Sequence, residues 1–283
     1  MGVKITKAII PVAGYGTRRL PVTKAIEKCM LPIGNRPIVD YVVEDCVRAG
    51  ITDIYFVINK TEHSQLKEYY SEDVELEKYL AERGKDVSVI KTAPEGVTFH
   101  YITQTGDKYG TAVPLALAAA EIGFDEQVVW CNGDDPFWNT PSGSEVKNMI
   151  DAVKTLDDAI AIGVVKPREE MSKYGMLVVE NDQLTGLVEK PALENVVSSL
   201  ANINRYIFSP KLFREIAEYV ATHDQAPTER GEWEATDPIR DYVAGGGVIR
   251  VIPATGEWLD SGSLEGWLYA NQVINSGKIS LTN

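Results

Sequence analysis

The sequence predicts an α/β fold, with a Rossmann-like open sheet that is mixed but mainly parallel, helices flanking the sheet, and a smaller C-terminal annex. Short apolar runs alternate with helical segments, which is the pattern of strands buried in a parallel sheet. Apolar residues make up 44% and charged residues 24% of the 283 residues, which is ordinary globular composition. The pattern changes near residue 166 to shorter strands, so we expect a single domain with a core over residues 1–165 and an annex over residues 166–283.

The first half opens with a strand, a loop, a helix and a second strand. The run K-A-I-I-P-V-A over residues 7–13 is apolar and is followed by glycines, as expected of a buried strand. A helix is expected over residues 37–49, because Pro37 stands in its first turn and Gly50 just past its end. Residues 53–59 predict the next strand. The alternation continues with strands at 98–102, 127–132 and 159–165 and helices at 111–121 and 144–156.

Residues 60–96 interrupt this alternation. They are polar and charged, and Gly84, Pro94 and Gly96 break them up, so we expect a helical insertion or lid near the sheet. In the annex we expect strands at 176–180, 184–189 and 201–208 and helices at 210–221 and 264–275.

The charge distribution restricts the partners. The net charge of -13 argues against nucleic acid, whose phosphate backbone demands a basic surface. The first 36 residues nevertheless hold seven Lys or Arg and one acid, which fits a small, dense polyanion bound near the start of the chain. No stretch approaches the ~18 apolar residues of a membrane span, and no cleavage-like site follows the basic start. We therefore expect a cytoplasmic protein without a membrane partner.

The cysteines and histidines give no sign of a structural metal. Cys29, Cys46 and Cys131 are odd in number and show no C-x-x-C spacing, and the three histidines are scattered. We expect neither a disulfide framework nor a zinc site, and we interpret the cysteines as small buried side chains.

The segment after the first strand, P-V-A-G-Y-G-T-R-R-L-P-V-T-K-A-I-E-K, is suited to phosphate. Gly14 and Gly16 let the backbone pass close to a ligand, and successive amides in such a turn form a concave anion site. Arg18, Lys24 and Lys28 add positive charge. We therefore expect a phosphorylated ligand.

The common glycine-rich nucleotide motifs do not fit this segment. A dinucleotide fingerprint fails because Arg19 stands where the third glycine belongs, and Pro21 prevents a helix from opening at the loop. The same failure argues against a nicotinamide oxidoreductase. A Walker P-loop is absent, and a plain tight turn would account for the glycines alone.

The complete string G-x-G-T-R-x-x-P-x-T-K, followed by K-x-M-L-P-I, resembles the signature of bacterial sugar nucleotidyltransferases. The stretch R-P-I-V-D-Y-V-V-E-D-C-V-R-A-G-I-T-D-I-Y-F-V-I-N extends the resemblance, which covers nearly the whole chain and is closest to members that use UTP and glucose 1-phosphate. It implies transfer of a nucleotidyl group to a sugar 1-phosphate, with release of pyrophosphate and formation of UDP-glucose. Relatives often form dimers or tetramers, so a homo-oligomer is expected.

The resemblance assigns roles within the basic segment. Four residues would hold the base and phosphates: Ala13, Gly14, Gly16 and Thr17. Arg18 and Lys28 would neutralise the triphosphate during reaction. No protein nucleophile is needed for an oxygen of the sugar phosphate to displace pyrophosphate from the α-phosphorus, and the sequence contains no G-x-S-x-G elbow.

Two aspartates predict a magnesium site. Asp134 and Asp135 come just past strand 127–132, at the edge where open α/β sheets bind ligands, and hard carboxylate oxygens suit Mg²⁺. Aspartates are also common in plain turns. The string W-L-D-S-G over residues 258–262 resembles the D-x-G element that completes the metal site in relatives. We expect Asp134 and Asp260 to be the magnesium pair.

Two further elements resemble those that contact the sugar phosphate in relatives, namely Y-G at 174–175 and V-E-K-P at 188–191. The resemblance implies that Gly175, Glu189 and Lys190 bind this substrate. A carboxylate accepts hydrogen bonds from sugar hydroxyls and an ammonium neutralises a phosphate, although neighbouring Glu and Lys are also a common surface pair.

The nucleobase is expected beside Gln104, Gly110 and Thr111. Gln104 stands where relatives contact the pyrimidine edge, and an amide offers both a donor and an acceptor. Such a group excludes purines better than it separates uracil from thymine.

Several positions depart from the pattern of the UTP-dependent members. Glu27 replaces a common proline, and Y-G-T-A-V-P over residues 109–114 lacks the usual histidine. G-E-W-E-A-T-D over residues 231–237 stands where relatives usually have G-E-x-Q-L-T-D, so Trp233 and Glu234 could change the sugar pocket or a subunit contact. A dTTP- or CTP-dependent hexose-1-phosphate nucleotidyltransferase and a catalytically silent regulatory paralogue remain alternatives.

Overall fold

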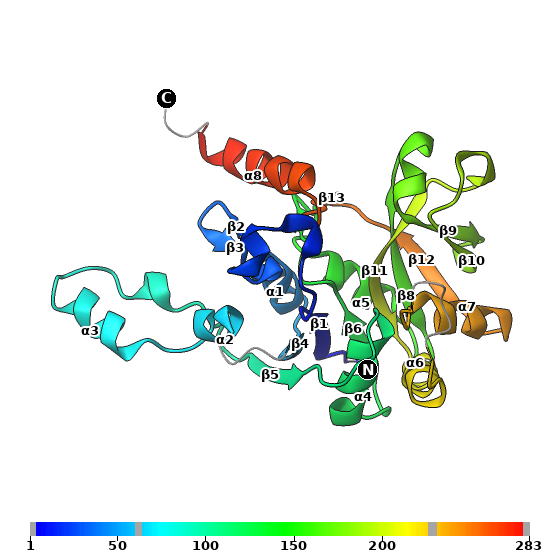
Figure 1. The fold of residues 1–283 in the computed structure, drawn as a ribbon, viewed down its shortest axis with the longest axis horizontal. Coiled ribbons are helices and arrows are strands. Elements are labelled where there is room, and N and C mark those ends of the chain that lie inside the picture. Colours follow the sequence, from blue (N-terminus) through cyan, green and yellow to red (C-terminus); the bar gives the residue numbers. More distant parts are fainter. Residues whose placement is uncertain (1–3, 60–63, 226–230, 280–283) are drawn as a thin grey trace.

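A nine-stranded mixed sheet runs through the molecule, with helices packed on both of its faces (Figure 1). The computed structural model describes residues 4–59, 64–225 and 231–279. The strand order is β5 (Thr98–Thr103), β4 (Asp53–Ile58), β1 (Lys7–Pro11), β6 (Val128–Trp130), β11 (Leu200–Phe208), β8 (Ala159–Val165), β12 (Ile249–Pro253), β10 (Gln183–Glu189) and β9 (Gly175–Glu180). The α/β class predicted from the sequence is confirmed.

Parallel pairing covers less of the sheet than the sequence predicts. The strands β5, β4, β1 and β6 pair in parallel, as do β8 and β12. β11 pairs antiparallel with β6, β8 and β9, and β10 pairs antiparallel with β9 and β12. For β9 and β10 the reason lies in their connection, because a tight turn at Asn181 and Asp182, both with positive φ, forces an antiparallel hairpin.

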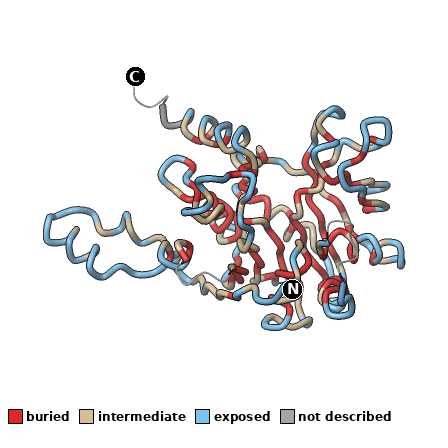
Figure 2. Tube along the Cα trace, in the orientation of Figure 1, coloured by how far each residue is buried: buried red, intermediate tan, exposed pale blue. Residues whose placement is uncertain are grey.

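Side chains from the strands alternate between two buried clusters. Ile9 and Trp130 face a cluster formed with α4 (Ala112–Ile122), α6 (Pro210–Thr222) and α7 (Thr236–Ala244). Their neighbours Ala8, Ile10 and Val129 face the opposite cluster, formed with α1 (Ile38–Arg48) and α5 (Glu145–Ala152). Because successive strand residues point to opposite faces, a strand buried on both sides must be apolar throughout, which is why these strands could be found in the sequence. Figure 2 shows the buried residues concentrated along the sheet.

Several elements differ from the sequence expectations. α7 and β12 were not expected, nor were four two-residue strands described below, and β11 begins one residue earlier than expected. The sheet also runs across residue 165 without a break, because β8 pairs with both β11 and β12 from the second half. All three cysteines are buried, as predicted.

The insertion between β4 and β5 is helical, as expected. It contains α2 (Gln65–Tyr69), α3 (Val74–Ala81) and a 3₁₀ turn (Ser88–Ile90), while residues 60–63 of the expected range lie outside the described part. In Figure 1 it projects as an arm away from the sheet, and α3 buries none of its residues. No residue of 64–96 lines the large cavity described below, so the described part of the arm gives no support to the lid interpretation.

Two small ribbons and the last helix complete the fold. The pair β2 (Pro32–Ile33) and β3 (Arg36–Pro37) lies against α8 (Leu264–Ile279) through a third apolar cluster. The pair β7 (Phe137–Trp138) and β13 (Glu257–Trp258) joins the segment after β6 to the segment before α8. None of the helices in the described residues has the length and apolar character needed to cross a bilayer.

Candidate active site

A cavity of about 1440 Å³ opens at the end of the sheet where β6 gives way to the Asp134–Asp135 turn. Its walls come from the basic segment after β1, the β9–β10 hairpin, and the starts of α7 and α8. Eight predicted site residues line it: Arg18, Lys28, Thr111, Asp134, Gly175, Glu189, Lys190 and Asp260. The other six predicted residues, Ala13, Gly14, Gly16, Thr17, Gln104 and Gly110, do not line it.

The predicted metal carboxylates and Arg18 converge at Gly262. A Cβ atom built on Gly262 would lie 3.1 Å from Asp260 Oδ1, 3.6 Å from Asp134 Oδ2 and 3.5 Å from Arg18 Nη2. The backbone N–H of Gly262 donates to Asp260 Oδ1 at 3.0 Å and holds that carboxylate in place. Three side chains from distant parts of the sequence therefore surround one point, and only a glycine leaves that point open.

Lys28 forms an ion pair with Asp134 inside the cavity wall, and both side chains are only about one-fifth exposed, at 20% and 21%. Burial alone would lower the pKa of Lys28, but the charge and hydrogen bond of Asp134 outweigh it, so the pKa is raised and the ammonium stays charged. A positively charged and a negatively charged group of the cavity wall are thus in direct contact.

Negative charge accumulates at the neighbouring Asp135. Its residue exposure is 8%, and its carboxylate accepts a hydrogen bond from Asn132 Nδ2 at 2.9 Å. Burial and the charges of Asp134 and Asp260 raise the pKa of Asp135 to about 8. Burial and the two neighbouring carboxylates therefore disfavour a negative charge on Asp135.

Arg205, which was not among the predicted site residues, anchors the turn that carries Asp134 and Asp135. Its side chain is 1% exposed, forms an ion pair with Asp45 on α1, and donates from Nη2 to the backbone carbonyl of Asp135 at 2.9 Å. Its guanidinium also lies 4.7 Å from the ring centre of Phe137. An arginine inside the otherwise apolar second half of β11 was the available signal, because a charge buried in a strand requires a partner.

The turn at Gly14 and Gly16 does not line the cavity, but Gly16 packs against Lys28, which does. Gly16 has φ 63°, and a Cβ there would lie 3.0 Å from both Lys28 Cβ and Thr23 Cγ2. Thr23 Oγ1 donates to the Gly16 carbonyl at 2.9 Å, while Gly14 has open space around it. As expected, no α-helix opens here, only a 3₁₀ turn over Thr17–Arg19.

Arg19 ties this turn to the segment around Asp260. It is 5% exposed, and its Nη1 donates to the Ser263 carbonyl at 2.8 Å and to the Ser261 carbonyl at 3.5 Å. Its guanidinium also lies 4.8 Å from the ring centre of Trp267. The residue that breaks the dinucleotide pattern thus fixes the distance between Arg18 and the D-x-G element.

Two of the predicted nucleobase residues, Gly110 and Thr111, lie in a loop that is hydrogen-bonded to residues 233–235. Trp233 N donates to the Tyr109 carbonyl at 2.8 Å, and Ala112 N donates to the Trp233 carbonyl at 2.9 Å. Thr111 Oγ1 donates to Glu234 Oε2 at 2.7 Å and accepts from Ala235 N at 2.8 Å. The divergent stretch around Trp233 is therefore in direct contact with the predicted nucleotide loop.

The predicted sugar-phosphate residues lie together at the open end of the β9–β10 hairpin. Gly175 pairs with Glu189 across the hairpin, and a Cβ on Gly175 would lie 3.0 Å from Glu189 Oε2. Lys190 has φ 43°, its backbone N–H donates to the Tyr174 carbonyl at 3.1 Å, and its Nζ lies 3.9 Å from Glu189 Oε1. Both charged side chains remain about half exposed, so they can reach a ligand.

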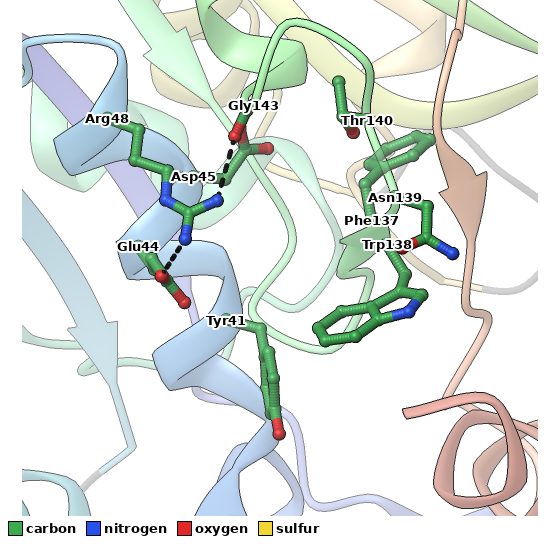
Figure 3. A pocket seen from close by; sticks show the side chains of 9 residues that line it. All are labelled: Tyr41, Glu44, Asp45, Arg48, Phe137, Trp138, Asn139, Thr140 and Gly143. Carbon is green, nitrogen blue, oxygen red and sulfur yellow. Dashed lines mark hydrogen bonds and ion pairs between the residues drawn. The ribbon is translucent and has the colours of Figure 1, made fainter. Parts of the chain in front are cut away.

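A second cavity, of about 220 Å³, lies between α1 and the loop after β7 (Figure 3). Arg48, which lines it, is already bound to Glu44 and donates to the Gly143 carbonyl at 3.3 Å. None of the fourteen predicted site residues lines this cavity, and its volume is below the ~300 Å³ at which ligand pockets usually begin. We assign the candidate active site to the larger cavity.

Comparison with known proteins gives concordant matches. A model of the nucleotidyl transferase family matches residues 7–277. The UTP–glucose-1-phosphate uridylyltransferase of Streptococcus pneumoniae is 36% identical over 246 residues, covering 83% of this chain and 79% of the relative. A crystal structure of UDP-glucose pyrophosphorylase complexed with UDP-glucose superposes with a TM-score of 0.80 at 28% identity, covering 97% of this chain and all of the other. The UTP-bound enzyme of Acinetobacter baumannii superposes with a TM-score of 0.84 at 25% identity, covering 97% and 94%.

Proposed function

Because the chain belongs to the nucleotidyl transferase family, we propose that it is a UTP–glucose-1-phosphate uridylyltransferase, which converts UTP and glucose 1-phosphate into UDP-glucose and pyrophosphate. The observation that carries this proposal is the convergence of Arg18, Asp134 and Asp260 on the open point at Gly262. That arrangement places a fixed positive charge and two hard carboxylates at the same position, as transfer between phosphates requires.

In the proposed reaction an oxygen of the sugar phosphate attacks the α-phosphorus of UTP, and pyrophosphate leaves. This displacement depends on positioning and on cancelling charge rather than on a protein nucleophile. Arg18 and Lys28 would stabilise the negative charge that builds up on the departing pyrophosphate. To do so Lys28 would exchange its ion pair with Asp134 for contacts with phosphate oxygens.

The residues at Gly262 fit a magnesium ion. Asp134 and Asp260 offer hard oxygen donors near one point, and burial together with their charges raises the pKa of Asp135, so a divalent cation here would relieve the repulsion between the carboxylates. The described residues hold no cluster of three or more His, Cys, Asp or Glu able to bind a metal. Mg²⁺ needs only one or two protein carboxylates when phosphates and water complete its shell, and it would supply charge neutralisation and Lewis acidity there.

Substrate recognition is proposed to divide between two parts of the chain. Residues up to about 165 would bind the nucleotide, with Gln104, Gly110 and Thr111 at the base. Residues 166–283 would form the sugar-phosphate annex, in which Glu189 accepts hydrogen bonds from sugar hydroxyls and Lys190 contacts the phosphate. The half-exposed hairpin end supports this role for Glu189 and Lys190, because both side chains face the cavity.

A grid of substrates tests the proposal. Pyrophosphate release is measured for the purified protein with UTP, dTTP, CTP or ATP against the 1-phosphates of glucose, galactose and glucosamine, with Mg²⁺ present. We expect the highest kcat/KM for UTP with glucose 1-phosphate. Release that does not depend on a sugar phosphate, or no release with any pair, would overturn the proposed function, and a clear preference for dTTP or CTP would overturn the assigned base.

A further inference from the structure

Lys166 is a basic residue of the cavity wall that the proposed reaction does not use. It follows the last residue of β8, and its backbone N–H donates to the Ser199 carbonyl at 2.9 Å, which fixes the start of the side chain. In residues 4–59, 64–225 and 231–279, no carboxylate lies within ion-pair distance of its ammonium group. Its charge is therefore available to a ligand without the loss of an existing ion pair.

Two aromatic rings hold the Lys166 ammonium in place. Its Nζ lies 4.8 Å from the ring centre of Trp258 and 5.7 Å from that of Tyr174. The two rings meet edge to face, with centres 5.4 Å apart and planes at 68°, so they form a firm corner. Because a ring face attracts a cation without neutralising it, this corner orients the ammonium and leaves its positive charge uncompensated.

The position of the Trp258 and Tyr174 rings indicates which part of a substrate Lys166 would contact. Trp258 lies two residues before Asp260, one of the candidate magnesium ligands, and Tyr174 directly precedes Gly175, which packs against Glu189. Lys166 thus lines the same cavity as Asp260 and Glu189, and the two rings beneath it lie near Asp260 in the chain and near Glu189 across the hairpin. In a sugar 1-phosphate bound with its hydroxyls at Glu189 and its reacting oxygen near Asp260, the negatively charged phosphate group lies at the end nearer to Asp260.

We propose that Lys166 binds the phosphate group of the sugar 1-phosphate and orients its oxygen for attack on the nucleoside triphosphate. The inference rests on the proposed function and adds a residue to it. Lys28 and Lys190 differ from Lys166 in that each already lies close to a carboxylate, Asp134 and Glu189 respectively.

The test compares Lys166→Met with two other lysine variants. Methionine keeps most of the aliphatic stem against the rings and removes only the charge. Lys211→Met is the matched control, because the Lys211 ammonium also lies over an aromatic ring, 5.4 Å from the centre of Tyr242, but Lys211 does not line the cavity. Lys173→Met tests whether another lysine of the cavity wall has the same effect. Lys173 lines the cavity, and no aromatic ring of the described residues lies beneath its ammonium group.

We expect Lys166→Met to raise the KM for glucose 1-phosphate roughly 10- to 100-fold, the usual effect of a lost charged hydrogen bond, and to change the KM for UTP less than about twofold. Titration calorimetry with glucose 1-phosphate and with glucose gives a readout independent of turnover. The variant should lose affinity for the phosphate ester only, and Lys166→Arg should restore part of it. Lys211→Met should behave as the wild type.

Three outcomes would overturn the inference: an unchanged KM for glucose 1-phosphate in Lys166→Met, an equal rise in the KM for UTP, or an equal effect of Lys173→Met. Thermal melting of each variant shows whether it is folded, and Lys166→Arg supplies a second variant if methionine is not tolerated. A wild-type protein inactive with every substrate pair would instead show that the proposed function itself fails. Activity of the wild type with normal kinetics of Lys166→Met would refute only the role of Lys166.

Discussion

The two walls of the cavity are held in different ways. The wall that carries Asp134 and Asp135 is anchored by Arg205, which is buried in the sheet and bound to both Asp45 and the Asp135 carbonyl. The opposite wall ends in Glu189 and Lys190, whose side chains are 49% and 46% exposed and contact each other only loosely. The groups that would perform the chemistry are thus tied to the core, whereas those that would select the sugar sit at a hairpin end. Substrate preference can change there with little effect on folding.

The largest effect is expected at the anchor of the first wall. Replacing Arg205 with Leu leaves Asp45 buried without its partner, and such a loss usually lowers the free energy of unfolding by about 3–5 kcal/mol. Urea unfolding measures the change. In contrast, Arg48→Leu removes an exposed ion pair on the same helix and should cost less than about 1 kcal/mol. Equal losses in both variants would contradict the view that the buried pair anchors this wall.

Removing a charged side chain from the proposed point of phosphate transfer at Gly262 should abolish most turnover. For Arg18→Ala and Asp134→Ala we expect kcat to fall about 10²- to 10³-fold, equivalent to ~3–4 kcal/mol, because each removes a preorganised charge at the point of transfer. Both variants should still fold. Asp151→Ala is the control, since the single ion pair that this exposed aspartate makes within the described residues is with Lys147 on α5. Near-normal turnover in purified Arg18→Ala or Asp134→Ala would refute the assigned roles.

A smaller effect is expected where the nucleotide loop meets Trp233. A Cβ on Gly110, which has φ 132°, would lie 2.5 Å from the backbone N and 2.7 Å from the backbone C of Trp233. Gly110→Ala should therefore lower the free energy of unfolding by about 1–3 kcal/mol and raise the KM for UTP more than that for glucose 1-phosphate. Gly84→Ala is the control for backbone strain alone, since Gly84 has φ 64° but no neighbouring atom with which a Cβ would clash. Wild-type KM values in Gly110→Ala would contradict the proposed role of this loop in nucleotide binding.

The smallest effect is expected at Glu234 and depends on pH. Burial, a hydrogen bond shared with Glu232 and the charge of Glu189 raise the pKa of Glu234 to about 7 from the ordinary 4.5. A raised pKa stabilises the protonated folded form, so this contribution is complete below about pH 4.5 and is lost as pH rises through about 7. Glu234→Gln, which cannot ionise, should differ least from the wild type at pH 5 and should gain ~1–2 kcal/mol in stability over the wild type by pH 8, after allowance for partial exposure.

Urea unfolding at pH 5, 6, 7 and 8 measures this dependence. Glu215→Gln serves as the control, because Glu215 lies on the surface of α6 beside Lys211. If Glu234→Gln and the wild type lose stability in parallel between pH 5 and pH 8, Glu234 is not the group responsible.

The sequence predicts the strands and the charged residues of the site better than it predicts the contacts between them. Strands such as β4 and β8 are apolar throughout because both faces of the sheet are covered, and this pattern is visible in one dimension. β12 was missed because Arg250 interrupts its short apolar run, and the structure places that side chain near Asp158 at 3.5 Å. An ion pair between residues so far apart in the sequence cannot be predicted from the local pattern of apolar residues.

The same limit applies to the site. Asp134 and Asp260 could be predicted from short motifs, yet their meeting at Gly262 depends on the pairing of β7 with β13. Arg205 and Lys166 belong to no motif, and their importance comes from partners far away in the sequence. The role of Gln104 at the base stays a prediction from the resemblance, because Gln104 does not line the cavity and its amide lies 3.5 Å from the Lys108 carbonyl.

The helical arm between β4 and β5 has a topological consequence. These strands are neighbours and run in parallel, with Asp53 beside Thr98 and Ile58 beside Thr103, so the chain must return along the full length of β4 before β5 can begin. Such a crossover takes at least about a dozen residues, and residues 59–97 supply many more. A shortened crossover would keep the sheet intact, whereas a tight turn would reverse β5. This is where the chain can gain or lose length while the order of its strands stays the same.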